Sequence, residues 1–105
     1  MLTVEQRSPT AFYCICADMA SDAQFADMVC EVMRSFDAVH SAADLTAHHS
    51  PTGCLVMEFI MVAGAVHTVS SVKSLLVSAL LTSARVMGDL AHALAAVAAA
   101  ATPAP

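Results

Sequence analysis

The sequence predicts an all-α fold: an antiparallel helical hairpin, or a small up-down bundle of three to four helices, with a break near residues 49–53. From Val66 to Val97, apolar residues recur at steps of three and four, opposite a line of polar residues. This spacing places each set on one face of an α-helix. A second apolar line with similar steps follows Ser21. The proline and glycine of the central break then predict that the two halves fold back on each other.

The composition predicts a single domain with more apolar surface than it can bury alone. We assign residues 1–101 to one helical domain and residues 102–105 to a frayed tail. Of the 105 residues, 58% are hydrophobic and only 12% are charged, and the mean hydropathy is +0.70. A globular domain usually has about 25% charged residues. The surplus apolar surface indicates an oligomer, a complex with a partner, or a membrane.

The charge is negative and unevenly placed, which excludes one large class of partner. Residues 1–50 carry seven acidic and two basic side chains, whereas residues 51–105 carry two of each, so the net charge of −5 lies in the first half. The four basic residues are scattered along the chain. We therefore expect no nucleic-acid partner and no polybasic attachment to anionic lipid.

The first predicted helix covers about residues 9–20, with Ser8 as its cap and Pro9 in its first turn. The apolar run 11–16 leaves a short strand open as the alternative. The four cysteines are expected to be buried free thiols in a reduced, cytoplasmic protein, although an even number also permits two disulfides. These cysteines are Cys14, Cys16, Cys30 and Cys54.

The second predicted helix starts at a capping box, in which Ser21 and Gln24 satisfy each other's backbone N–H groups. We expect this helix to run to about His48. Its apolar side chains repeat at steps of four and three, as in a heptad seam. They are Phe25, Val29, Val32, Phe36, Val39 and Ala43.

The third helix is predicted in the nearly unbroken apolar run from Cys54 to Val66. Periodicity cannot separate a buried helix from a buried strand here, and the helical pattern that follows favours a helix. We expect Glu58, which interrupts this run, to face solvent or to pair with a histidine or lysine. Gly64 and Gly88 are weak points of the helical pattern.

The favoured function is a non-enzymatic helical interaction or self-association module, whose partner is itself or another helical protein. The two apolar seams would be buried against each other and in a homo-oligomer or partner complex. The predicted interface residues are Phe25, Val29, Val32, Phe36, Val39, Val69, Leu76, Leu80, Met87, Leu90 and Leu94.

The alternative is a small membrane protein with one span near residues 54–72. This segment has the length and hydropathy of a membrane-spanning helix. Small side chains at steps of four, from Ser70 to Thr82, would suit close helix contact in lipid. Glu58 and His67 oppose this interpretation because polar groups are costly at membrane depth.

Polar side chains at Asp37, His40, Asp44 and His48 would lie on one stripe of the second helix. Imidazole and carboxylate groups at this spacing can share a divalent metal. One helix seldom completes a metal site, so we interpret the stripe as solvent-facing. The sequence contains no phosphate-binding loop, no dinucleotide fingerprint and no nucleophile elbow. We therefore predict neither an enzyme nor a cofactor.

Overall fold

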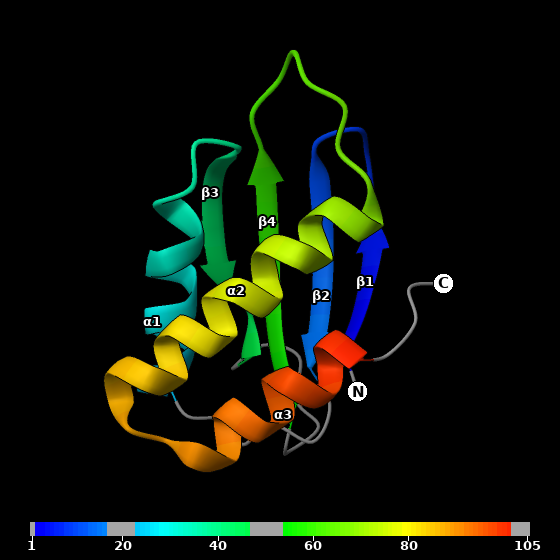
Figure 1. The fold of residues 1–105 in the computed structure, drawn as a ribbon. Helices are drawn as coiled ribbons and strands as arrows, with labels where there is room; N and C mark the ends of the chain where they lie inside the picture. The colour runs from blue at the N-terminus through cyan, green and yellow to red at the C-terminus, as the bar shows by residue number, and fades with distance from the viewer. Residues whose placement is uncertain (1, 17–22, 47–53, 102–105) are drawn as a thin grey trace.

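The fold of this protein combines an antiparallel sheet with helices (Figure 1). The computed structural model describes residues 2–16, 23–46 and 54–101. These residues form four strands and three helices, so the predicted all-α fold, whether helical hairpin or bundle, is wrong. The elements are β1 (Leu2–Gln6), β2 (Ala11–Cys16), α1 (Ala23–Arg34), β3 (Val39–Asp44), β4 (Leu55–Met61), α2 (Val69–Met87) and α3 (Leu90–Ala101).

The strands lie in the order β1-β2-β4-β3, and each neighbouring pair is antiparallel. The central pair joins β2 to β4, with Phe12 opposite Phe59 and Tyr13 opposite Glu58. The two central strands are therefore distant in sequence and come together only in the folded chain. A register shift between Val39 and Ser41 makes β3 irregular.

The runs 11–16 and 55–61 are strands, which corrects the prediction of helices in both places. Burial alternates along β2 and from Met57 onward in β4, as expected for strands with one face on a core, while Leu55 and Val56 at the start of β4 are both buried. Cys14 faces the core from β2, while Tyr13 and Ile15 face away from it and are half-buried. The open alternative for residues 11–16, a short strand, is the correct one. Pairing of β2 with β4 satisfies the backbone of both runs, which local periodicity could not reveal.

The second predicted helix is also too long, because α1 ends at Arg34 and the chain turns back into β3. The Ser35 and Phe36 N–H groups donate to the carbonyl oxygens of Val32 and Met33, which closes the last turn. Arg34 then donates to the Ala42 carbonyl oxygen at 2.8 Å and fastens the helix end to β3. The predicted cap at Ser21 and the predicted end at His48 lie outside the described residues.

The helical pattern after Val66 is confirmed, in two pieces. Thr68 caps α2, its side chain accepting from the Ser71 N–H at 3.0 Å while the Ser71 side chain accepts from the Thr68 N–H. Gly88 ends α2 in the left-handed conformation, with φ of 69°. This conformation is costly for residues with a Cβ atom. The predicted weak point at Gly88 is thus the corner between α2 and α3.

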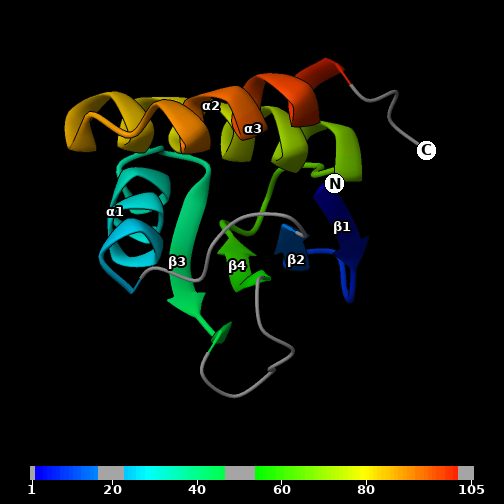
Figure 2. The same cartoon turned by 90° about the horizontal axis from the view of Figure 1, so that it is seen from below.

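The core lies between one face of the sheet and the helices. Figure 2 shows α2 and α3 on the same side of the sheet, and α2 crosses the strands diagonally in Figure 1. Helix α1 packs against α2 and β3, and α3 packs mainly against α2. The largest side chains that are fully buried include Phe12, Phe25, Phe59, Met33, Leu55, Met57, Leu76 and Leu80.

Candidate interaction surface

Helix α3 exposes large apolar side chains on the side that faces away from the core. Leu90, Leu94 and Val97 are 71%, 61% and 55% exposed, and Ala101 is exposed at the end of the helix. Steps of four, three and four place these residues on one side of the helix. We call these four residues the α3 stripe. An exposed apolar stripe of this kind is typical of a binding surface.

The opposite side of α3 is fixed against the rest of the molecule by His92 and Ala96, which are buried. The His92 ring stacks on Phe25 of α1, with centroids 3.9 Å apart and an interplanar angle of 11°. Such stacking contributes about 0.5–1.5 kcal/mol beyond area burial. Because α3 is tied down through this side, the α3 stripe must face outward.

Asp89 starts α3 and contacts the same histidine. Its Oδ1 accepts from the His92 backbone N–H at 3.1 Å, as a helix cap does. Its Oδ2 lies 2.7 Å from His92 Nδ1. The backbone hydrogen bond from His92 is the main cause that lowers the pKa of Asp89. Asp89 and His92 together set the direction and rotation of α3.

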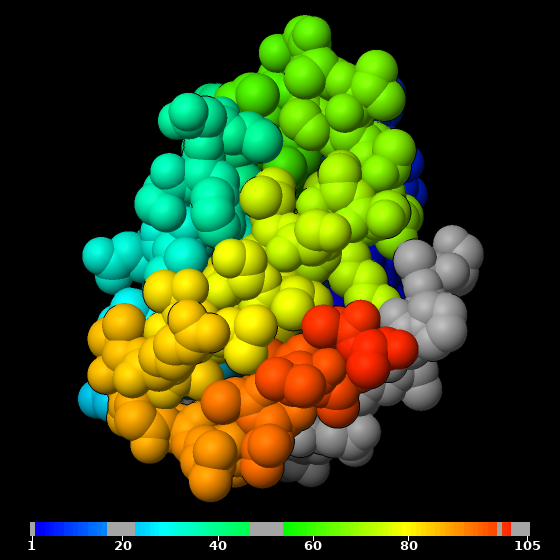
Figure 3. All heavy atoms as spheres, in the orientation of Figure 1, coloured from blue at the N-terminus to red at the C-terminus, as the bar shows by residue number. Residues whose placement is uncertain are grey.

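The exposed side of α2 is chemically different from the α3 stripe beside it. Ser70, Ser74, Ser78 and Thr82 are all exposed and form a polar line on α2. His67 and His92, which the sequence pattern also places on the polar side, are buried instead. Figure 3 shows this face of the molecule, with α2 in yellow and α3 in orange to red. The exposed side of α2 between Ser70 and Thr82 is therefore polar, and the largely exposed leucines lie on α3.

The structure divides the predicted interface residues into three groups. Phe25, Val29, Leu76 and Leu80 are fully buried and Val39 is nearly so, which places them in the protein's own core. A second group packs partly buried against that core: Val32, Phe36, Val69 and Met87. Only Leu90 and Leu94 are largely exposed. They remain the part of the predicted set that can reach another molecule.

Val97 and Ala101 complete the α3 stripe but are missing from the predicted interface. The signal was available, because residues 90–101 contain no charged side chain at all. A helix with no charge on any side either is buried all round or meets a partner. Two further apolar side chains, Val66 and Val86, are 91% and 66% exposed outside α3.

The predicted polar stripe on one helix does not exist, since His40 and Asp44 belong to β3 and Asp37 lies in the turn before it. Asp44 Oδ1 already accepts from the N–H and the hydroxyl of Thr46, at 2.9 and 2.6 Å. His48 lies outside the described residues. Within the described ranges, no three potential ligands come together. The geometry therefore gives no support to the metal alternative.

The thiols of Cys14, Cys16 and Cys30 are buried, and Cys54 is half-buried. Cys14 and Cys16 both point from β2 into the core, since alternate residues of a strand share a face. Burial raises the pKa of Cys16 to about 12 and that of Cys30 to about 11. These thiols remain protonated near neutral pH and act as small core side chains.

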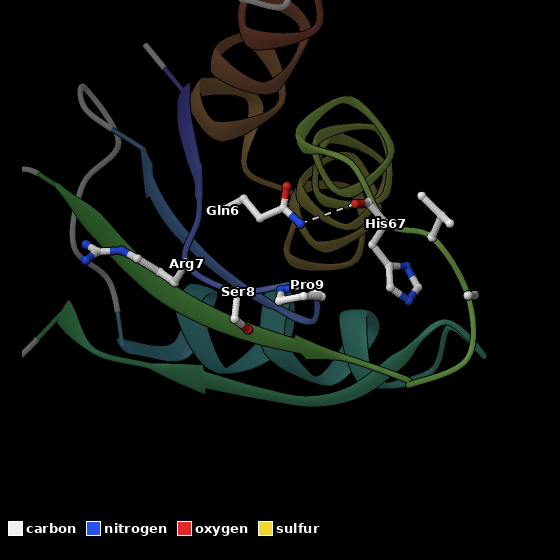
Figure 4. Close-up of a pocket in the computed structure, with 7 residues that line it drawn as sticks. Gln6, Arg7, Ser8, Pro9 and His67 are labelled. Carbon is white, nitrogen blue, oxygen red and sulfur yellow. Dashed lines mark hydrogen bonds between the residues drawn. The ribbon is translucent and has the colours of Figure 1, made fainter.

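A pocket of about 510 Å³ lies where the β1–β2 turn meets the connection from β4 to α2 (Figure 4). The Gln6 side chain joins the two segments, while the His67 and Ser8 side chains make contacts within their own segments. Gln6 donates to the His67 carbonyl oxygen at 3.4 Å, and His67 Nε2 lies 2.8 Å from the Val62 carbonyl oxygen. The Ser8 hydroxyl accepts from the Ala11 N–H at 3.0 Å. These contacts brace the turn and include no pairing of a nucleophile with a base.

The face of the sheet opposite the helices is mixed rather than apolar. Glu58 lies at its centre, opposite Tyr13 on one side and Ala43 on the other, and is partly exposed. This agrees with the expectation that Glu58 reaches solvent. Arg7 lies over the Tyr13 ring, 4.8 Å from its centroid, and pairs with Glu5 at 3.1 Å. Charged groups therefore accompany the apolar side chains on this face.

The chain matches no protein-family model, no curated protein and no solved structure. Its residues and their arrangement therefore carry the functional argument. By length and composition alone, one helix in the described part of the chain could cross a membrane, namely Val69–Met87. The same helix packs Leu76 and Leu80 into the core, as the central helix of a water-soluble fold also does.

Proposed function

We propose that this protein is a non-enzymatic binding module that docks an apolar protein surface onto the α3 stripe. The observation that carries the proposal is the exposure of Leu90, Leu94 and Val97 along one side of a helix that is otherwise fastened to the fold. Complete burial of a leucine or valine side chain contributes about 1.5–3 kcal/mol. A partner that covers the stripe therefore gains this free energy for several side chains, less the free-energy cost of association.

The chemistry of the stripe restricts the partner. Residues 90–101 contain no lysine or arginine that could hold a phosphate, and the chain as a whole carries a net charge of −5. Nucleic acids and anionic lipid headgroups are therefore unfavourable partners. An uncharged helix or groove on a protein fits the stripe, since it loses no solvated charge on contact.

The second candidate is membrane insertion, and helix Val69–Met87 is the observation that favours it. The span expected from the sequence, residues 54–72, instead comprises β4, a connection and the first turn of α2. Insertion of α2 would remove Leu76 and Leu80 from the core. We rank docking first because it leaves the fold intact.

The test measures whether the α3 stripe is covered in intact cells that contain the protein. Val97→Cys places an apolar thiol of similar size on the stripe, and Ser78→Cys places one on the polar line of α2. Cys54→Ser serves as the background, because Cys14, Cys16 and Cys30 are buried. A membrane-permeant maleimide should label Val97→Cys several times more slowly in cells than in dilute purified protein.

Ser78→Cys is the matched control, because Ser78 is exposed on the neighbouring helix. It should react equally fast in cells and in dilute solution. Equal labelling of Val97→Cys in both settings would overturn the docking proposal. Protection of both positions, with recovery of the protein in the membrane fraction, would favour insertion of α2 instead.

A further inference from the structure

We infer that the partner of the α3 stripe is a second copy of this chain, bound with its α3 antiparallel to the first. The two-fold axis passes between Leu94 and Val97. This inference rests on the proposed function, since it names the occupant of the same surface. It follows from the spacing of the stripe and from the placement of charge, and the size of the surface sets the strength of the association.

The spacing of the residues in the α3 stripe is the same in both directions along the helix. The steps from Leu90 to Leu94, to Val97 and to Ala101 are four, three and four. In an antiparallel pair, Leu94 therefore meets Val97 of the second copy, and Leu90 meets its Ala101. A large side chain faces a small one at the ends, and two branched side chains meet at the centre. A surface that contacts its own copy requires this self-complementarity.

The charges of the chain leave this face available to a second copy. The excess negative charge lies in residues 1–50, so contacts through that half bring like charges together. Residues 90–101 carry none, and the nearest charged residues along the sequence, Arg85 and Asp89, precede α3. An antiparallel pair separates the two Asp89 carboxylates by about the length of the helix, roughly 18 Å, which exceeds the Debye length. A parallel pair would place them side by side.

The surface is small, which sets the strength of the association. A helix of this length presents a strip about 18 Å long and about 10 Å wide. That is well below the ~800 Å² that each partner contributes to a standard interface. The dimer is therefore expected to dissociate in the micromolar range, so that monomer and dimer exchange as the protein concentration changes.

The test is a charge-reversal experiment on the purified full chain by analytical ultracentrifugation. The unmodified protein should pass from monomer to dimer over a hundredfold range of micromolar concentrations. Leu94→Glu alone and Val97→Lys alone should each weaken self-association more than about a hundredfold, because each homodimer would bury two unpaired charges. Both positions are exposed in the monomer, so circular dichroism should show an unchanged fold.

Mixing the two variants distinguishes the antiparallel pair. Glu at position 94 of one copy then faces Lys at position 97 of the other, while the second contact keeps its original Val97 and Leu94. The dissociation constant of the mixed dimer should lie within about tenfold of that of the unmodified protein. In a parallel pair the two introduced charges would not meet, and mixing would restore nothing.

Val66→Glu is the control, because Val66 is 91% exposed but lies outside α3. It should leave dimerisation unchanged. A chain that stays monomeric throughout the concentration range, or a Leu94→Glu variant that dimerises normally, would overturn the inference. Protection of Val97→Cys in cells with a monomeric purified chain would keep the docking proposal and exclude the second copy. Equal labelling of Val97→Cys in cells and in dilute purified protein would overturn the docking proposal itself.

Discussion

Helices α2 and α3 follow each other at a corner that contains Gly88 and are both rich in apolar residues, yet they place these residues differently. Helix α2 buries Leu76, Ala79 and Leu80 completely. Among the side chains of α3 whose burial the structure describes, His92 and Ala96 are the buried ones, and the leucines point outward. The difference shows that apolar content does not decide whether a helix belongs to the core. The direction of its apolar side does.

The two helices are also fixed by different means. α2 crosses the sheet on its core side and is held by the burial of its inner side chains, among them Leu76 and Leu80 (Figure 2). α3 rests on α2 and is oriented by a cap at Asp89 and by one ring stack between His92 and Phe25. An isolated helix of this length is only marginally stable in water. Its contacts with α2 and with Phe25 of α1 therefore hold α3 in place and leave its outer side exposed.

The largest effect is expected from truncation of a core leucine in α2. Leu76→Ala should lower the free energy of unfolding by about 2–5 kcal/mol, because it removes fully buried methyl groups and leaves a cavity. The matched change in α3, Leu94→Ala, should alter it by less than about 0.5 kcal/mol in the monomer. Urea denaturation at low protein concentration measures both. Similar losses at the two positions would break the distinction between the helices.

A smaller effect is expected where α3 touches α1. His92→Ala removes the ring stack on Phe25 and should cost about 1–3 kcal/mol, from lost stacking and burial. Hydrogen exchange should then show faster exchange in α3 than in α2. Uniform acceleration across the whole molecule would show instead that α3 is an integral part of the cooperative core.

A substitution at the corner between the helices should lower the free energy of unfolding by about 1–2 kcal/mol. Gly88→Ala places a Cβ atom on a residue with φ of 69°, which costs about 1–2 kcal/mol for a left-handed residue. The space around Gly88 is open, so the cost is backbone strain alone. Thermal unfolding should show the decrease. An unchanged midpoint would mean that the corner relaxes, and that the direction of α3 does not depend on it.

The smallest effect concerns pH. The backbone hydrogen bond from His92 lowers the pKa of Asp89 in the folded state, so the stabilisation is present above the carboxyl group's ordinary range. It is lost as the pH falls below about 4 and through the lowered value. Asp89→Asn keeps a cap acceptor without the charge. Its difference in stability from the unmodified chain should shrink between pH 6 and pH 3, and a difference that stays constant would exclude the linkage.

The sequence alone determined the helices whose apolar residues repeat at steps of three and four. The pattern after Val66 became α2 and α3, and the apolar line after Ser21 became α1 over its first turns. Leu90 and Leu94 were identified as interface candidates from the same periodicity, and they are exposed. These features depend on neighbours three or four residues apart, which is the information that a sequence pattern contains.

Tertiary structure alone decided the sheet. The runs 11–16 and 55–61 are short and apolar, so each fits a buried helix or a buried strand equally well. Their identity follows from pairing between residues such as Phe12 and Phe59, which are far apart along the chain. β3 formed where a continued helix was expected, because pairing with β4 satisfies its backbone. The tertiary structure also decided which apolar helix side stays exposed, because the sheet and the neighbouring helices bury the others.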